Sequence, residues 1–121
     1  MFEIIVRQNF SAAHQIEGYP GNCSELHGHN WRIELCIGVG ELNELGMALD
    51  FKQAKKILRE IIGKLDHTFL NDNPFCSGGN PTAERLAELI YIQAAGKIPE
   101  KVSINSVTVW ESENAGVRYS K

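Results

Sequence analysis

Long apolar runs, paired cysteines and a strong charge of either sign are all missing from this chain of 121 residues. No apolar stretch approaches the roughly 18–20 residues that a membrane-spanning helix needs. The three cysteines show no C-x-x-C spacing, which argues against a disulfide framework and a cysteine-rich structural zinc site. The net charge of −3 argues against a broad nucleic-acid-binding surface. The first residues lack the pattern of a signal peptide, so we expect a cytoplasmic protein that binds neither membrane nor nucleic acid.

The residues that are present have the composition of an ordinary globular protein, 43% hydrophobic and 22% charged. The length predicts one domain over residues 1–121. Alternating apolar and polar residues predict strands over residues 2–10 and 30–39, and two more over 102–111 and 115–120. The strands therefore fall into two groups, one at each end of the chain.

Two segments between these groups have helical spacing. Residues 51–65 place their apolar side chains on one stripe, and Asp50 is the predicted N-cap, with Gln53 completing a capping box. A second helix is predicted to start near Asn80-Pro81, with the proline in its first turn, and to end at Gly96.

The predicted order is therefore strand, strand, helix, helix, strand, strand, an α+β fold. Two helices cover only one face of a four-stranded antiparallel sheet, and the edge strands of such a sheet need protection. We expect either a polar open face or assembly with further copies of the chain.

The histidines are few but clustered. There are four in the chain, and His14, His27 and His29 lie within sixteen residues. In an extended segment, residues two apart point to the same side, so His27 and His29 can reach one metal ion. A hairpin would bring His14, at the end of the first strand, beside them. Three nitrogen ligands with an open fourth position are the arrangement of a catalytic zinc, although chance grouping on a polar loop is the alternative.

The cysteines differ in their surroundings. Cys23 lies in a Gly/Asn/Ser loop four residues before His27, where it is a fourth metal ligand, a base or nucleophile, or an inert thiol. Spacing does not decide between these roles. Cys36 in a strand and Cys76 in a loop are interpreted as structural.

Asp66 and Glu111 are two further candidate functional residues. Asp66 next to His67 suggests a carboxylate that orients an imidazole, but this needs an irregular turn, and a histidine favoured by the helix dipole is the simpler interpretation. Glu111 continues the apolar face of the third predicted strand. It either grips a guanidine-like edge of a ligand or is the solvated end of a strand.

In their order along the chain, five segments resemble the family of the 6-pyruvoyl- and 6-carboxy-tetrahydropterin synthases. The resemblance covers essentially the whole chain, and its segments are Phe10-Ser11-Ala12-Ala13-His14, Cys23-Ser24-Glu25-Leu26-His27-Gly28-His29-Asn30, Leu65-Asp66-His67-Thr68-Phe69-Leu70-Asn71, Asn80-Pro81-Thr82-Ala83-Glu84 and Trp110-Glu111-Ser112.

The resemblance implies the tunnelling fold, whose sheets join into an oligomeric barrel, typically a homohexamer of two trimers with active sites at subunit boundaries. It implies zinc (Zn2+) on the three histidines and 7,8-dihydroneopterin triphosphate as the substrate. Cys23 matches the family's catalytic base, and Asp66 and His67 match the pair that works with it. Glu111 matches the carboxylate that anchors the pterin, and Thr82 falls in the segment that borders the pterin from a neighbouring subunit.

The spacing of Cys23 and His27 favours the 6-carboxy branch, which releases acetaldehyde and leads towards 7-deazaguanine compounds such as queuosine. The 6-pyruvoyl branch is the first alternative, and a non-catalytic zinc-binding protein is less favoured. Glu25 adds a minor alternative, because some relatives use a glutamate in place of the cysteine and form a hydroxymethyl pterin.

Overall fold

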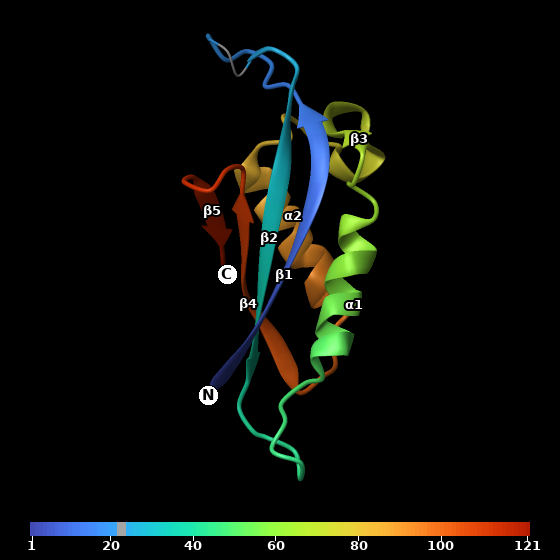
Figure 1. The fold of residues 1–121 in the computed structure, drawn as a ribbon, viewed down its shortest axis with the longest axis vertical. Helices are drawn as coiled ribbons and strands as arrows, with labels where there is room; N and C mark the ends of the chain where they lie inside the picture. Colours follow the sequence, from blue (N-terminus) through green and yellow to red (C-terminus); the bar gives the residue numbers. More distant parts are fainter. Residues whose placement is uncertain (22–23) are drawn as a thin grey trace.

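A five-stranded sheet, with strand order β3-β1-β2-β4-β5, forms the framework of the computed structural model, which describes residues 1–21 and 24–121 (Figure 1). The elements are β1 (Phe2–His14), β2 (His27–Val39), α1 (Phe51–Ile62), β3 (Thr68–Phe69), η2 (Leu70–Asp72), η3 (Pro74–Cys76), α2 (Ala83–Ala95), β4 (Val102–Trp110) and β5 (Gly116–Tyr119). Four strands are antiparallel to their neighbours as predicted, and the short β3 adds a parallel pairing to β1. The α+β tunnelling fold is confirmed. The fifth strand was not predicted, because two residues are too few for a periodic signal.

The central pair, β1 and β2, is longer than the alternation predicts. Their antiparallel register runs from Phe2 opposite Val39 to His14 opposite His27. The prediction ended the first strand at residue 10 and started the second at residue 30. Cross-strand hydrogen bonds continue through small residues such as Ala12 and Gly28, whose side chains give no hydrophobic alternation. The extension carries both strands up to the histidines.

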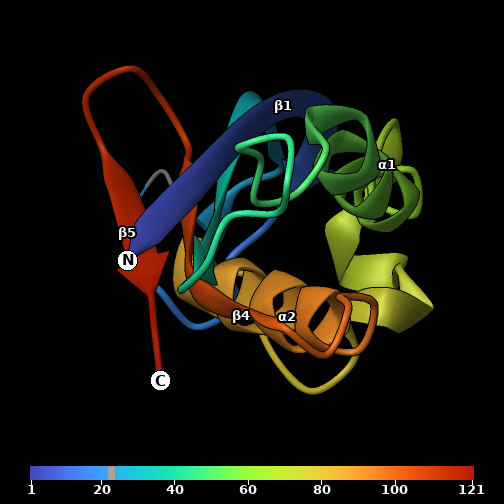
Figure 2. The ribbon, with the colours of Figure 1, turned by 90° about the horizontal axis from the view of Figure 1, so that it is seen from below.

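Helix α1 packs against β1, and α2 packs against β4 and β5, on the same side of the curved sheet (Figures 1 and 2). Between the layers lies a core whose largest side chains include Trp31, Ile33, Leu35 and Ile37 of β2, all fully buried. Apolar residues of α1 face it as the stripe predicts, except Phe51, which is 61% exposed at the first position of the helix.

The helix starts differ in detail from the predictions. Asp50 caps α1, but its carboxylate accepts from the backbone N–H of Lys52 at 2.8 Å rather than from Gln53. Helix α2 begins at Ala83, with Thr82 as its N-cap, so Pro81 precedes the helix instead of lying in its first turn. This shift leaves the Pro81 carbonyl outside the helical hydrogen bonds, where it accepts a bond from a histidine.

Candidate metal centre and pterin site

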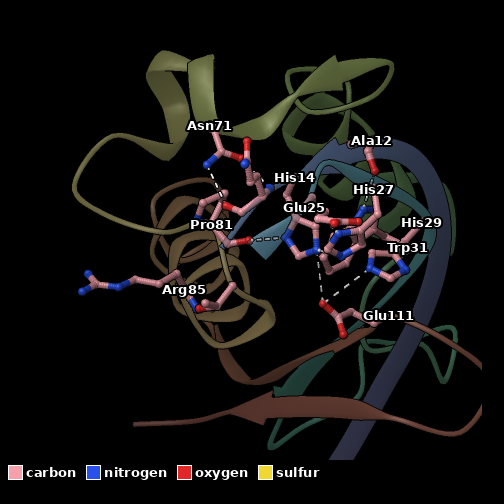
Figure 3. A network of polar contacts seen from close by, with 12 residues as sticks. Ala12, His14, Glu25, His27, His29, Trp31, Asn71, Pro81, Arg85 and Glu111 are labelled. Carbon is pink, nitrogen blue, oxygen red and sulfur yellow. Dashed lines mark hydrogen bonds and ion pairs between the residues drawn. The ribbon is translucent and has the colours of Figure 1, made fainter. Parts of the chain in front are cut away.

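The three clustered histidines meet at the end of the β1–β2 pair. His14 and His27 are direct cross-strand partners, and His29 lies opposite Ala12. The Nε2 atoms of His14 and His27 are 2.9 Å apart, and the candidate ligand atoms of all three side chains lie within 4.8 Å of one another. Figure 3 shows the imidazoles pointing toward one another. Strand register brings together a site that is separated in sequence by a loop.

Two backbone carbonyls fix which ring nitrogens face this centre. The Nδ1 of His14 lies 2.9 Å from the Pro81 carbonyl oxygen, and the Nδ1 of His27 lies 2.7 Å from that of Glu25. A carbonyl only accepts hydrogen bonds, so each Nδ1 carries the proton and donates it. The lone pairs of both Nε2 atoms therefore point into the centre.

These lone pairs fit a metal ion. Two unprotonated nitrogens 2.9 Å apart repel each other unless a cation or a proton lies between them. The Nε2 atom of His29 is buried and has no hydrogen-bond partner among the described residues. Buried polar atoms are rarely left unsatisfied, and a carbonyl-bonded histidine with a free Nε2 is the usual form of a metal ligand. The residues present suit a divalent transition metal with nitrogen ligands.

The surroundings of the cluster favour the neutral form of His29. His14 is 1% exposed, and the Trp31 ring packs edge-on against both His14 and His29, with centroids 5.0 Å apart in each case. Burial lowers the pKa of His29, and the neighbouring Glu111 carboxylate only partly opposes this effect. An imidazole with a lowered pKa keeps its lone pair available at neutral pH.

Glu111 lies beside the histidines, one residue beyond the end of β4 (Figure 3). Its Oε1 atom is 3.6 Å from Nε2 of His14 and 3.8 Å from Nε2 of His29. Glu111 and Thr82 both line a cavity of about 410 Å³, together with Ile16 and Tyr19. The structure therefore brings both predicted substrate-binding residues to one cavity at the edge of the histidine cluster.

Asp66 and His67 form the irregular turn that their pairing requires. His67 has a φ of 59°, an unusual value for a residue with a side chain, and its Nδ1 lies 3.0 Å from Oδ1 of Asp66. Ser11 holds the turn from both sides, because its N–H donates to Asp66 Oδ1 at 2.9 Å and its carbonyl accepts from the His67 N–H. The Ser11 N–H lowers the pKa of Asp66, and the His67 side chain adds to this effect.

The position of His67 excludes the simpler interpretation of a helix-end histidine. Helix α1 ends at Ile62, and the dipole effect is confined to the last turn. The His67 side chain is 81% exposed, and it borders a hollow of about 470 Å³ together with His29. The pair therefore lies on the same side of the molecule as the histidine cluster.

Of the three cysteines, Cys23 lies outside the described residues, so its predicted role stays a prediction. Cys36 is a buried free thiol in β2, and Cys76 is a partly buried free thiol at the end of η3. Burial raises the pKa of Cys76 to about 11. A thiol with such a pKa is protonated at neutral pH, in agreement with a structural role.

Several contributors to the site were not predicted. The Pro81 carbonyl accepts a hydrogen bond from His14, and the Trp31 ring packs against His14 and His29. The side chains of Asn71 and Asn80 hydrogen-bond the backbone just after His14. Asn71 and Asn80-Pro81 belong to segments that carried the family resemblance, but no spacing rule assigns a backbone carbonyl or an amide to a distant partner. These roles depend on tertiary contacts.

An α+β sheet that brings three histidines, a carboxylate and a cavity to one end defines the class: a tunnelling-fold protein with a histidine triad that could hold a metal ion. Comparison with known proteins gives the family. The chain belongs to the 6-pyruvoyl tetrahydropterin synthase family, whose model matches residues 3–121. It is therefore an enzyme, a lyase of the tetrahydropterin synthase type.

Two curated relatives differ in their named activities. A 6-carboxy-5,6,7,8-tetrahydropterin synthase of Synechocystis sp. is 33% identical over 126 residues, which cover 98% of this chain and 93% of that protein. A dihydroneopterin monophosphate aldolase of Pyrococcus furiosus is 32% identical over 114 residues, covering 94% and 93%. Because the chain is about equally identical to both relatives, sequence identity alone does not decide which product it forms.

The fold is also found in a solved structure. The 6-pyruvoyl tetrahydropterin synthase of Caenorhabditis elegans superposes with a TM-score of 0.87 at 22% identity, covering 99% of this chain and 95% of that one.

Among the described residues, no helix is long and apolar enough to cross a membrane.

Proposed function

We propose that this protein is a zinc-dependent 6-carboxy-5,6,7,8-tetrahydropterin synthase, built as one domain over residues 1–121. It would convert 7,8-dihydroneopterin triphosphate to 6-carboxytetrahydropterin, acetaldehyde and triphosphate on the route to 7-deazaguanine compounds such as queuosine. The observation that carries the proposal is the convergence of three histidine side chains, with ligand atoms within 4.8 Å of one another, beside the Glu111 cavity. The four-residue spacing of Cys23 and His27 and the Synechocystis relative favour the carboxy branch.

His14, His27 and His29 would hold the zinc. Nitrogen ligands suit zinc well, and two of the three rings are already oriented by backbone carbonyls. A zinc ion bound there supplies Lewis-acid polarisation of a substrate oxygen.

Glu111 would anchor the pterin in the adjoining cavity. The guanidine-like edge of a pterin presents N–H donors, and a carboxylate accepts two such bonds in parallel. Thr82 borders the same cavity at the start of α2. A ring bound to Glu111 lies next to the histidines, because the same carboxylate is within 4 Å of two of them.

Cys23, Asp66 and His67 would transfer the protons. A Cys23 thiolate would remove a proton from the substrate side chain, and the His67 imidazole would exchange protons with its oxygens. Asp66 would keep the His67 ring oriented through the 3.0 Å contact. Loss of the triphosphate by elimination, followed by cleavage of a carbon–carbon bond with uptake of one water molecule, would then complete the reaction.

Assembly into a homohexamer of two trimers in the cytoplasm is part of the same proposal. The sheet face opposite the helices leaves side chains such as Ile5 exposed, at 49%. The 81% exposure of the His67 side chain supports the proposal that it would reach a site completed by a neighbouring copy.

A second candidate is cleavage of dihydroneopterin to a hydroxymethyl pterin, with Glu25 as the base. The Glu25 side chain is exposed two residues before His27, and the Pyrococcus furiosus relative is named an aldolase. The 6-pyruvoyl synthase reaction remains the alternative that needs no change in the set of site residues.

The product of the zinc-loaded protein, determined by mass spectrometry with 7,8-dihydroneopterin triphosphate as substrate, tests the proposal. We expect a carboxytetrahydropterin with acetaldehyde, lost in Cys23→Ala and retained in the matched variant Glu25→Gln. The latter keeps the backbone carbonyl that holds His27. A pyruvoyl or hydroxymethyl product would replace the carboxy assignment by the corresponding alternative. No conversion by folded, zinc-replete protein would favour a non-catalytic metal-binding protein.

A further inference from the structure

One edge of β1 remains hydrogen-bonded after the strand has ended. Gln15 and Glu17 follow His14 outside the strand, yet the N–H and C=O groups of both are paired. Ser11, further back on the same edge, is paired with Asp66 and His67. These three positions are odd-numbered, as expected for residues that present their backbone groups to one side of an extended segment.

The partners beyond the strand end are two asparagine side chains. Asn71 accepts from the Gln15 N–H and donates to the Gln15 carbonyl, both at 2.8 Å. Asn80 accepts from the Glu17 N–H and donates to the Glu17 carbonyl, both at 2.9 Å. Each amide therefore makes the two bonds that a neighbouring strand would make.

Side chains form these hydrogen bonds because the backbone after β3 no longer lies beside β1. β3 pairs with β1 only at Ala12 and Ala13, and the chain then turns into the 3-10 helix η2. A carboxamide has one acceptor oxygen and an N–H donor, the same pair of groups as a peptide unit. Asn71 in η2 and Asn80 before α2 thus extend the edge of β1 by two positions.

The extension determines which side chains face the site. In an extended segment, side chains alternate, so Ile16 lies on the same side as His14. Ile16 lines the cavity of about 410 Å³ that contains Thr82 and Glu111. Asn80 also precedes Pro81, whose carbonyl holds His14. Asn80-Pro81 therefore contacts both the candidate metal ligand His14 and the segment that carries Ile16, a wall of the candidate pterin cavity.

We propose that Asn71 and Asn80 are positioning residues for substrate binding, whose paired amide bonds hold the segment after His14 in place so that Ile16 forms a wall of the pterin cavity. Neither side chain needs to touch the substrate. The inference rests on the proposed function, because it assigns the cavity beside Glu111 to the pterin.

The substitutions Asn71→Asp and Asn80→Asp test this inference with almost no change in shape. A carboxylate still accepts from the backbone N–H but faces the Gln15 or Glu17 carbonyl with a second acceptor, so one bond of each pair is lost. We expect KM for 7,8-dihydroneopterin triphosphate to rise about tenfold, with kcat changed less than about threefold and zinc content unchanged, because an unpaired acceptor shifts the segment rather than the reacting groups.

Asn43→Asp is the matched control. It introduces the same charge at an asparagine whose side chain only accepts, from the N–H groups of Leu45 and Met47. We expect its KM to stay within about twofold of the wild type, because the carboxylate still accepts both hydrogen bonds that the Asn43 side chain accepts. Asn80→Ala separates lost hydrogen bonds from added charge near an anionic substrate. It should raise KM as Asn80→Asp does, and an effect confined to the charged variant would overturn the proposal.

Amide hydrogen exchange, measured by NMR, provides a second readout that does not depend on turnover. The N–H groups of Gln15 and Glu17 should be protected in the wild type, and the Glu17 N–H should exchange faster in Asn80→Ala, which removes its acceptor. Rapid exchange in the wild type, or an unchanged KM in variants that exchange faster, would overturn the proposal. If the wild type converts no substrate, the proposed function fails. Equilibrium binding of neopterin to the same variants then replaces KM, and equal affinity in all of them would overturn the positioning role.

Discussion

The two histidine-containing parts of the site are built in different ways. The cluster of His14, His27 and His29 lies on paired strands, buried against Trp31. Asp66-His67 lies on a turn with a positive φ, and its imidazole is 81% exposed. The first part is fixed by the register of a long antiparallel pair. The second is held by the backbone groups of Ser11 and by the bond from the Asp66 N–H to the Ile62 carbonyl.

Under the proposed function, this difference separates metal binding from proton transfer. A metal centre needs several ligands held at fixed distances, which a strand pair provides through many cooperative hydrogen bonds. A group that moves protons needs access to the substrate and freedom to change protonation, which an exposed turn permits. The strained backbone of His67 is kept because both Ser11 groups hold it. Changes in the two parts should therefore have separable effects.

Loss of a histidine from the strand pair should have the largest effect. In His14→Ala, the centre loses a ligand whose ring is 1% exposed and fixed by the Pro81 carbonyl. We expect bound zinc to fall from about one per chain to near zero and turnover to fall on the order of a thousandfold, since metal polarisation is lost. Metal analysis and product formation measure this, and full zinc retention would contradict the assignment of His14 as a ligand.

His67→Ala should affect turnover without affecting metal. The substitution removes the exposed imidazole but leaves the strand register intact, so zinc content should match the wild type. We expect kcat to fall about a hundredfold, at the lower end of what a general acid or base contributes. A variant that loses zinc as His14→Ala does would show that the two parts of the site are one structural unit.

Trp31→Phe tests the contribution of the indole ring that packs against His14 and His29. The indole N–H donates to the Ala12 carbonyl at 3.1 Å, and both groups are buried. We expect the free energy of unfolding in urea to fall by about 1–3 kcal/mol, because a buried acceptor loses its partner. Trp110→Phe, at a half-buried position in β4, is the control and should cost less. Equal losses would mean that ring volume, rather than the hydrogen bond, determines the effect.

Cys76, a partly buried thiol, lies outside both parts of the site. With its pKa raised to about 11, the Cys76 thiol should react with iodoacetamide at pH 8 at least about a hundredfold more slowly than an exposed thiol, since only the thiolate reacts. Mass spectrometry of the alkylated peptides measures the rate. The same thiol in urea-unfolded protein is the reference, and equal rates in both states would contradict its burial.

The sequence predicted most of the fold because strands and helices leave periodic patterns. The stripe on α1 and the alternation in β2 correctly placed five residues of the helix and the apolar face of the strand in the core. The prediction was wrong where tertiary contacts decided: β3 has only two residues, and α2 begins at Ala83 after the N-cap Thr82, which leaves Pro81 outside its first turn. Neither feature has a local signal that outweighs its neighbours.

The site was predicted unevenly for the same reason. The spacing of His27 and His29 places both on one face of a strand, and their approach to His14 follows from a hairpin. The paired amides of Asn71 and Asn80 had no such pattern, because their partners lie more than fifty residues away in sequence.

The sequence by itself therefore determined the order of the elements, the three clustered histidines and the resemblance to a synthase family. Periodicity and spacing are local properties, and they survive without knowledge of distant contacts. Only the tertiary structure decided that the Nδ1 atoms of His14 and His27 donate to carbonyls, that Glu111 and Thr82 share a cavity, and that Ser11 holds Asp66-His67. Each of these depends on backbone groups, which every residue carries alike and which acquire specific partners only when the chain folds.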